Sequence, residues 1–521
     1  MTGIVSRVVR DGTAAAGQVL PVNANEPEDH GTAGWSRRAG RFANRWREWV
    51  DVPRQFGIAM VIVVIFFGGA AGTTALIFVH RHHALRVAGE RAGASVIESQ
   101  NLRVDLSYAD ANAAALVFDE VKLDLDLNWN NPQLARDAYD ATRTEHAVTD
   151  KVTDAEMALA ELRRLNTNLC PDHGTNPTDL ADSSCEGDLL DLLERQIPTY
   201  TDLVATARAH NRVGQQVAQA YLQHASALMQ NKILPAVDQL FVLTGADLDR
   251  ESRRATDATH EVEIAVLLGT CCCTALGSQL LLFRRTQRVF DVRLLAGTGV
   301  LLLAGGLMFA GMGIERSRVV TAQEKGYQPM VLFTQARVLA LQTRTDDNLS
   351  LISLSDRAQY DQGSQDAVRA LGYDLDGKQL ATGSLPAGRR GALVAALDRL
   401  PAPDRPALTA DLDAWLSTRA VVTALLAPAG VAENPAGGVD EELSRFARAT
   451  LLTVNCREPA FARLDQELDK VLNVRQADFR ARMSASAPPL DWLGWSGFAG
   501  VLVAALFILA GFRRRLREYA A

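Results

Sequence analysis

The hydrophobic residues of this chain gather in four long runs, separated by stretches in which apolar positions recur every three or four residues. The first run, Phe56–Val79, contains no charged residue. A helix rises about 1.5 Å per residue, so this run spans the roughly 30 Å hydrocarbon core of a bilayer. Three further runs follow it: Ile264–Phe283, Leu294–Ile314 and Trp492–Phe512. The pattern therefore predicts four transmembrane helices.

Basic residues predict how these helices are oriented. Arginines crowd the stretch before the first run, residues 284–293 between the second and third runs are short and basic, and residues 513–521 after the fourth are basic as well. Positively charged flanks stay in the cytoplasm. All three clusters therefore predict a multi-pass protein of the cell membrane with both termini in the cytoplasm.

The two long segments between the membrane runs are predicted to lie outside the cytoplasm. Residues 80–263 and 315–491 are rich in Ala, Leu, Asp and Arg, and their apolar residues recur at helical spacing. Breaks rich in Pro, Gly or Asn divide each segment into several helices. We expect an all-α membrane protein with two extracytoplasmic four-helix-bundle-like domains in tandem.

Prolines distinguish the fourth membrane run from the others. Pro488 and Pro489 stand directly before it, whereas no proline adjoins the first three connections between runs and bundles. Proline breaks or kinks a helix because it lacks an N–H and clashes with the preceding turn. The sequence predicts three stiff connections and one hinge.

The segment before the first run divides into two parts. Residues 1–34 are polar and predict a disordered cytoplasmic terminus. Residues 35–55 predict a basic amphipathic juxtamembrane helix on the inner leaflet, or else only a positively charged flank. Either reading leaves candidates for docking a cytoplasmic partner: Trp35, Arg37, Arg38, Arg41, Trp46, Arg284 and Arg285.

Composition and motifs argue against several function classes. The net charge of -7 over 521 residues makes nucleic acid a poor partner. The chain has no phosphate-binding loop, nucleophile elbow, HExxH or CxxC motif, so we expect no catalytic residue, cofactor or metal. The predicted cytoplasmic parts are too short for a kinase or cyclase, and a signal would pass to a separate protein.

Two of the six cysteines flank a short polar loop in the first external region. Cys170 and Cys185 predict a disulfide in an oxidising compartment, which contributes roughly 3 kcal/mol in the chain-entropy model. Since His173 lies in the same loop, a metal site is the alternative. Cys271–Cys273 fall within the second run, where packing is favoured over redox chemistry. His80, His82 and His83 form either a polar interfacial flank or a metal- or pH-sensing group.

Three segments resemble a known family. Ser107–Phe118 (SYADANAAALVF), Tyr200–Phe241 and Gly326–Ile352 are similar to recurrent segments of the GlnX-type membrane proteins of actinobacteria. The resemblance extends to the layout with four crossings. It marks candidate motif or partner positions within or beside these segments: Tyr108, Asp110, Tyr200, Asn211, Arg212, Tyr221, Met229, Pro235, Asp346 and Asp347.

The resemblance implies a signalling relay. In that family, an extracytoplasmic lipoprotein, GlnH, binds acidic amino acids, the membrane protein receives that state, and a cytoplasmic serine/threonine kinase, PknG, responds. We therefore expect a non-enzymatic transmembrane sensor or adaptor for amino acids. The alternatives are a direct sensor of a small ligand and a structural component of an envelope assembly. The sequence leaves a homo-oligomer open.

Overall fold

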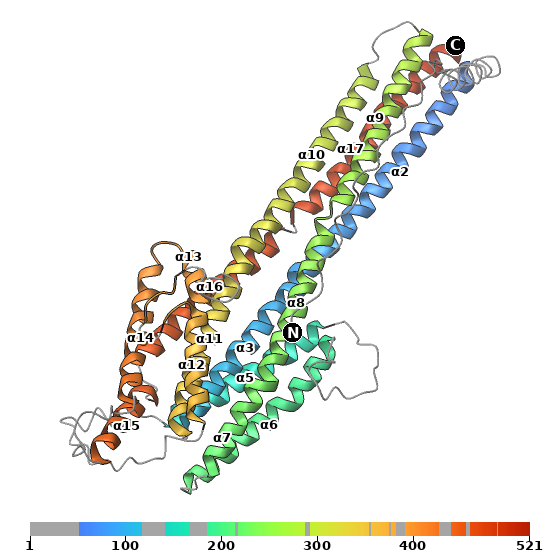
Figure 1. Ribbon diagram of the computed structural model, residues 1–521. Coiled ribbons are helices and arrows are strands. Elements are labelled where there is room, and N and C mark those ends of the chain that lie inside the picture. Colours follow the sequence, from blue (N-terminus) through green and yellow to red (C-terminus); the bar gives the residue numbers. More distant parts are fainter. Residues whose placement is uncertain are drawn as a thin grey trace, which may run out of the picture. The chain divides into compact units, whose positions relative to one another are not determined.

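The computed structural model describes the chain in eleven stretches: residues 52–116, 141–166, 185–213, 217–286, 292–353, 356–374, 377–381, 391–426, 439–454, 459–486 and 488–520. The chain divides into two compact units, Met1–Ile62 with Gly511–Ala521, and Val63–Ala510. The packing described below belongs to the second unit. In the described stretches the secondary structure is helical apart from one isolated antiparallel bridge, Tyr373 with Gln379 (Figure 1). The predicted all-α class is confirmed.

The first half of the chain contains long helices interrupted by two π-helical turns. In order they are α2 (Val52–Arg86), the π turn η1 (Val87–Ala92), α3 (Gly93–Leu116), α5 (Ala141–Leu165), α6 (Glu186–Arg212), α7 (Val217–Leu228), the π turn η3 (Met229–Ile233), α8 (Leu234–Ala255) and α9 (Ala258–Thr286).

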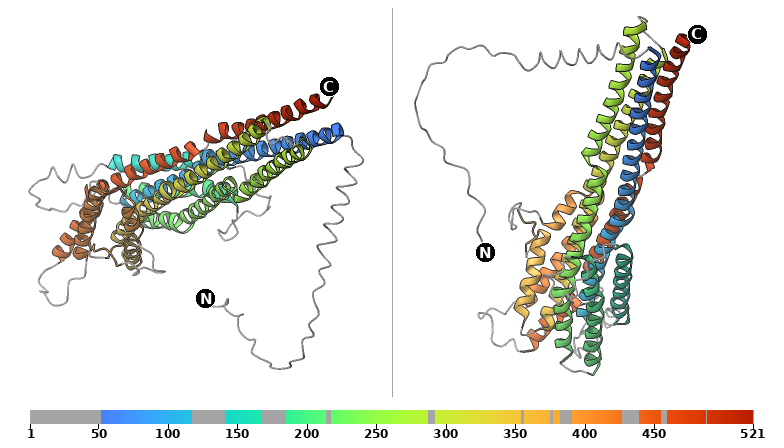
Figure 2. Two further views of the ribbon diagram at one scale, coloured as in Figure 1. Left: turned by 90° about the horizontal axis from the view of Figure 1, so that it is seen from above. Right: turned by 90° about the vertical axis from the view of Figure 1, so that its right-hand side faces the viewer.

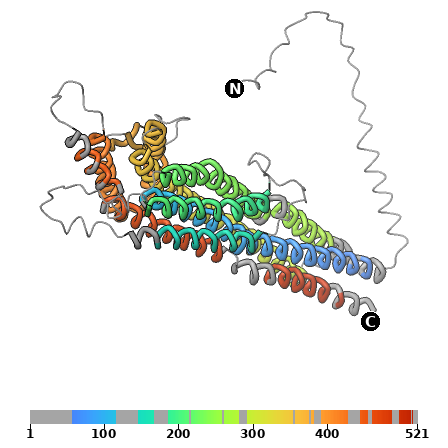
Figure 3. The backbone as a smooth tube through the Cα atoms, turned by 90° about the horizontal axis from the view of Figure 1, so that it is seen from below, coloured from blue at the N-terminus to red at the C-terminus, as the bar shows by residue number. Residues whose placement is uncertain are grey.

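The second half begins in the same way and continues with shorter helices. In order they are α10 (Val292–Ala322), the π turn η4 (Gln323–Tyr327), α11 (Gln328–Ile352), α12 (Arg357–Leu371), α13 (Ala392–Asp398), α14 (Arg405–Leu426), α15 (Val439–Val454), α16 (Pro459–Ser486) and α17 (Pro488–Ala520). The tube in Figure 3 follows this order along the chain.

Three helical stretches among the described residues are long and apolar enough to cross a membrane. They are Met60–Ala115, Glu261–Leu280 and Val292–Ile352, and they overlap the first three predicted runs. The apolar stretch of α17, Ser496–Gly511, is shorter. Large apolar side chains such as Ile65, Leu76 and Leu303 are exposed on these helices, which suits contact with lipid rather than water. The fourth predicted span is not confirmed.

Small residues let the apolar helices approach one another closely. A Cβ atom built on Gly497 of α17 would lie 2.5 Å from Met308 Sδ of α10, and one on Gly500 would lie 2.5 Å from Ala304 Cβ. On the other side of α10, a Cβ on Gly305 would lie 3.1 Å from Leu268 Cδ1 of α9. Such close contacts are typical of helices packed in a membrane, where burying apolar surface supplies little driving force. The long helices can be followed from two directions in Figure 2.

One predicted connection differs from expectation. α8 ends at Ala255 and α9 begins at Ala258, so the path into the second apolar run is broken. Thr256 ends α8 by turning its polar atoms back onto it: both its N–H (3.1 Å) and its Oγ1 (2.8 Å) donate to Ser252 O. The prediction of an unbroken second connection is wrong. α16 ends at Ser486 and α17 begins at Pro488, and the residue between them lies outside the described stretches, so the hinge there stays a prediction.

The two predicted external bundles share their core. α3 of the first half packs against α11 of the second, and each large apolar cluster mixes residues of both halves. Leu349 and Ile352 of α11 belong to the cluster formed by α5, α6 and α7, while Val96 and Val104 of α3 belong to the cluster around α14 and α16. Two separate domains in tandem are therefore not confirmed.

α11 occupies the centre of this shared core. Of its 25 residues, 18 are buried, and they face every direction around the helix. Eight of the buried residues are polar or charged: Thr334, Arg337, Thr343, Arg344, Thr345, Asp346, Asn348 and Ser350. A helix buried all round with so many polar groups needs partners on its neighbours, because an unpaired buried polar group costs roughly 1–3 kcal/mol.

We expect Leu349→Ala in the full-length protein to lower the free energy of unfolding by about 2–5 kcal/mol, since it leaves a cavity in the core that both halves share. Hydrogen exchange should also quicken in α6 and α7 of the first half. Leu452→Ala, on an exposed position of α15, is the matched control and should change little. Faster exchange confined to α11 and α12 would contradict the shared core.

Candidate functional site

Two carboxyl groups lie buried where α3, α7 and α11 meet. Asp110 of α3 is 4% exposed and Asp346 of α11 is 3% exposed. Asp110 stands among Leu106, Ala109 and Ala113, which are buried at helical spacing. The sequence of α3 thus turns this acid into the core together with its apolar neighbours.

Polar side chains from the first half connect the two carboxyls. Ser226 Oγ of α7 donates a hydrogen bond to Asp110 Oδ2 at 3.0 Å. Gln230 Nε2 donates to Ser226 Oγ at 3.3 Å and to Asp346 Oδ1 at 3.5 Å. We call these four residues the carboxyl cluster. Gln230 lies in the π turn η3, and π turns are frequent at functional sites because they redirect side chains.

Burial changes the acidity of both carboxyls. It raises the pKa of Asp110 to about 7, although Ser226, Gln230 and Tyr200 lower it in part. Burial likewise raises the pKa of Asp346 to about 7, and the charges of Asp347 and Asp110 raise it further. Both lie more than 30 residues beyond the predicted ends of the membrane runs. The cluster can therefore gain or lose a proton near neutral pH.

Two buried polar atoms beside the cluster lack a hydrogen-bond partner among the described residues: Tyr200 Oη of α6 and Asn348 Oδ1 of α11. Tyr200 lies close enough to Asp110 to affect its pKa, but its hydroxyl is not in hydrogen-bonding geometry. Asn348 Nδ2 does donate, to the backbone oxygen of Ala111 at 3.2 Å. Tyr200 Oη and Asn348 Oδ1 can therefore each form a further hydrogen bond.

Asp347, next to Asp346 in sequence, faces a different set of partners. Arg419 of α14 donates from Nε to Asp347 Oδ2 at 3.1 Å. Ser364 of α12 accepts from Arg419 and donates to Asp347. The adjacent acids of α11 thus play different roles, since Asp347 forms an ion pair within the second half and Asp346 faces the first half.

Gly363 of α12 leaves room for the Asp346 carboxylate. A Cβ at this position would lie 2.7 Å from Asp346 Oδ2, closer than Cβ atoms approach their neighbours. The glycine thus lets α12 lie against the carboxyl cluster. Any larger side chain would force the Asp346 carboxylate, which also contacts Gln230, to move.

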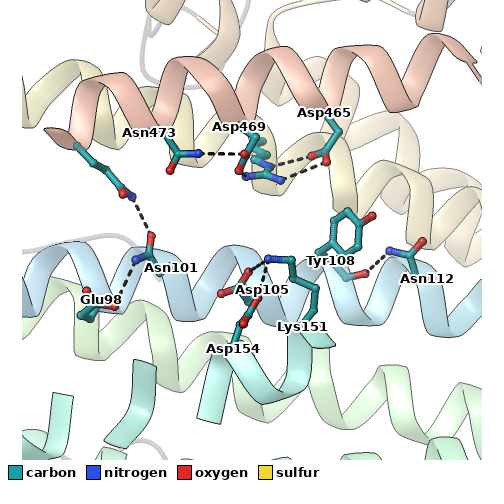
Figure 4. Close-up of polar contacts among 12 residues, drawn as sticks. Glu98, Asn101, Asp105, Tyr108, Asn112, Lys151, Asp154, Asp465, Asp469 and Asn473 are labelled. Atoms are coloured by element: carbon teal, nitrogen blue, oxygen red, sulfur yellow. Dashed lines mark hydrogen bonds and ion pairs between the residues drawn. The ribbon is translucent and has the colours of Figure 1, made fainter. Parts of the chain in front are cut away.

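A second polar layer joins α3 and α11 to the long helix α16. Arg337 of α11 donates to both carboxylate oxygens of Asp465, at 2.8 and 3.2 Å, and also pairs with Asp469. Gln476 Nε2 of α16 donates to Asn101 Oδ1 of α3 at 2.8 Å. Figure 4 shows these acids of α16 facing the polar stripe of α3. On the other side of α3, Lys151 donates to Asp105 at 2.9 Å.

Four of the candidate positions predicted from the sequence come together here: Asp110, Tyr200, Asp346 and Asp347. Met229 packs in the apolar core beside Gln230. Pro235 is the second residue of α8, two positions after the end of η3, and the backbone oxygen of Tyr108 accepts a hydrogen bond from Asn112.

The other three candidates do not reach the cluster. Asn211 and Arg212 form the end of α6, roughly three turns beyond Tyr200. Tyr221 stacks on His210, with the ring centroids 5.3 Å apart.

Sequence reasoning missed several residues of the site: Ser226, Gln230, Asn348, Gly363, Ser364 and Arg419. Arg419 had a usable signal, because it continues the buried face of α14 after Leu412, Trp415 and Leu416. A charged residue at a buried helical position needs a partner. Ser226 and Gln230 had no such signal, since small polar residues are common on exposed helix faces.

Several predicted positions lie outside the described residues: Trp35, Arg37, Arg38, Arg41, Trp46 and Cys170. Arg284 and Arg285 belong to the last turn of α9, and their role stays a prediction. Cys185 stands at the N-cap of α6. Because Cys170 lies outside the described residues, the disulfide between the two also stays a prediction. Over the stretches that the structure describes, no three His, Cys, Asp or Glu side chains are placed to hold a metal ion.

Comparison with known proteins identifies part of the chain. Residues 84–253 match the family model described as an actinobacterial sensor domain. The match covers about a third of the chain, includes Asp110, Ser226 and Gln230, and supports an actinobacterial sensor protein. No curated protein and no solved structure matches the chain.

We expect Asp110→Asn to change stability in a pH-dependent way. Folding raises the pKa of Asp110 from 3.8 to about 7, so the folded state binds more protons than the unfolded state between these values. Its stability therefore falls as the pH rises through that window, by about 1.4 kcal/mol per pH unit. The variant should unfold at a higher temperature than the wild type at pH 8, with a smaller difference at pH 5.

Asp347→Asn is the matched control. This substitution leaves the largely buried Arg419 without its carboxylate. We expect it to lower the free energy of unfolding by about 3 kcal/mol and to lower the unfolding temperature at both pH values. Thermal unfolding of the detergent-solubilised full-length protein measures both variants. If the unfolding temperatures of Asp110→Asn and the wild type differ equally at pH 5 and pH 8, folding does not raise the pKa of Asp110.

Proposed function

We propose that this chain is a non-enzymatic transmembrane sensor that relays the state of an external binding protein to an effector in the cytoplasm. The observation that carries this proposal is the continuity of two helical paths. The path α2–η1–α3 extends from the first apolar run to Asp110, and the path α10–η4–α11 extends from the third apolar run to Asp346. A movement at the carboxyl cluster therefore has a direct route to the membrane.

The matched sensor domain supports the role, and the cluster supports the mechanism. Gln230 connects the two paths at their far ends through its contacts with Ser226 and Asp346. A partner that favours one arrangement of this contact would shift the population of the two states, and the membrane helices would shift with it. The ends of the paths would move by small displacements, as packed helices do.

The partners we propose follow from the resemblance to GlnX-type proteins. They are an extracytoplasmic lipoprotein that binds amino acids, like GlnH, and a cytoplasmic serine/threonine kinase, like PknG. In this arrangement the chain crosses the membrane four times with both termini in the cytoplasm. The basic segments 35–55 and 284–293 would then be the surface available to the kinase.

Cross-linking in native membranes tests the relay. We expect the full-length protein to be recovered together with a solute-binding lipoprotein and a serine/threonine kinase. Asp110→Asn should leave the recovery of the kinase unchanged but alter the kinase's response to added amino acids, because Asp110 lies outside the basic segments predicted to dock the kinase.

The orientation has its own test within the same proposal. Reporter fusions within 80–263 and 315–491 should be active outside the cytoplasm, and fusions to either terminus should be active inside it. The relay would be contradicted if the full-length protein is recovered at good yield with neither partner, or if an external region is found in the cytosol.

A second candidate function is the direct sensing of a small polar ligand. The observation that favours it is the pair of buried polar atoms without partners, Tyr200 Oη and Asn348 Oδ1, beside the carboxyl cluster. Titration of the purified full-length protein with amino acids, in the absence of any lipoprotein, separates the two. Saturable binding that Tyr200→Phe weakens would favour direct sensing.

A further inference from the structure

Two π-helical turns lie at matching places in the two halves of the chain. η1 begins at Val87 and η4 at Gln323, in each case less than three helical turns beyond the predicted end of a membrane run. Each interrupts a helix that is otherwise continuous. The halves share no clear sequence identity here, so the common position reflects a common place in the architecture.

The hydrogen bonds define these turns. Gly93 N–H donates to Ala88 O at the end of η1, and Gln328 N–H donates to Gln323 O at the end of η4. Each bond reaches back five residues rather than four, so each turn contains one more residue than an α-helical turn. Pro329 stands two residues after the end of η4 and supplies a local cause, because proline has no N–H and clashes with the carbonyl four residues earlier.

One aromatic side chain packs against both turns. Phe479 of α16 is 1% exposed. A Cβ on Gly326 of η4 would lie 3.2 Å from its Cδ2, and one on Gly93, directly after η1, would lie 3.5 Å from its Cε1. Gly326 thus makes room for the ring, and the same ring lies in ordinary contact with Gly93. Tyr327 of η4 lies beside that ring as well, with the centroids 6.1 Å apart.

We propose that η1, η4 and Phe479 form a joint through which a movement of one half's helix is passed to the other half. An extra residue can move along a helix without breaking it, and the segment that it passes turns by about 100° per residue. Because Phe479 packs tightly on Gly326 and also contacts Gly93, a change at either turn displaces the ring against the other. The joint works within this chain and does not depend on which partners the sensor has.

Hydrogen exchange of the full-length protein tests the joint by changing the shared ring. Phe479→Leu should speed amide exchange in both residues 87–93 and residues 323–328, by about tenfold in each. Phe461→Leu is the matched control: it is the same substitution at an equally buried phenylalanine of α16, which packs on Trp415 instead. It should leave both turns unchanged.

A pair of glycine variants tests transmission from one side only. A Cβ at Gly326 would press on Phe479, and we expect Gly326→Ala to alter exchange in residues 87–93 of the other half. A Cβ at Gly89 of η1 would make only an ordinary contact, 3.7 Å from Met483 O. Gly89→Ala should therefore alter exchange in η1 alone.

The double variant Gly326→Ala/Phe479→Leu completes the design. In it, residues 87–93 should exchange as they do with Phe479→Leu alone, because the ring that transmits the change is gone. The joint is refuted if Phe479→Leu affects only one turn, if Phe461→Leu affects both equally, or if Gly326→Ala still acts on residues 87–93 without the ring. Should Gly326→Ala not fold, the phenylalanine pair decides alone.

Discussion

The burial of α11 on nearly all its faces is the constraint on which the rest of this structure depends. A helix in that position cannot leave its polar residues to water, so every neighbour must supply partners for them. α3 supplies a backbone oxygen for Asn348, η3 supplies Gln230 for Asp346, α14 supplies Arg419 for Asp347, and α16 supplies two carboxylates for Arg337. The helices of both halves are held in one arrangement by the requirements of a single helix.

The carboxyl cluster differs from the other polar contacts of α11 in the kind of partners its acids have. Most polar groups of α11 that meet a neighbour find an opposite charge or a close hydrogen bond, as Arg337 does with Asp465. Asp110 and Asp346 instead share neutral partners, and burial disfavours their charged forms. A buried carboxyl whose pKa lies near neutral can gain or lose its charge after a small change in its surroundings. Its place between the two halves makes the cluster suited to sensing.

The path from this cluster to the membrane is continuous but not uniform. α3 and α11 each join an apolar helix through a π turn, and the two turns meet the same phenylalanine of α16. The path from α8 differs, because it is broken at Thr256 before α9 begins. Two routes therefore pass a displacement along a helix backbone, whereas the route through Thr256 can absorb it. This division is a property of the backbone and holds for any partner.

Local patterns were enough to predict the helical class and the first three apolar runs. Run length acts on the chain through its immediate neighbours, which a sequence displays directly. The acids of the site were also visible, since Asp110, Asp346 and Asp347 occur in helical segments that resemble a known family. Tertiary structure alone decided that Asp110 and Asp346 share Gln230 while Asp347 turns to Arg419, and that the halves share one core. These choices depend on which helix faces pack together, and contacts between residues 72 or 116 positions apart leave no local pattern from which they could be read.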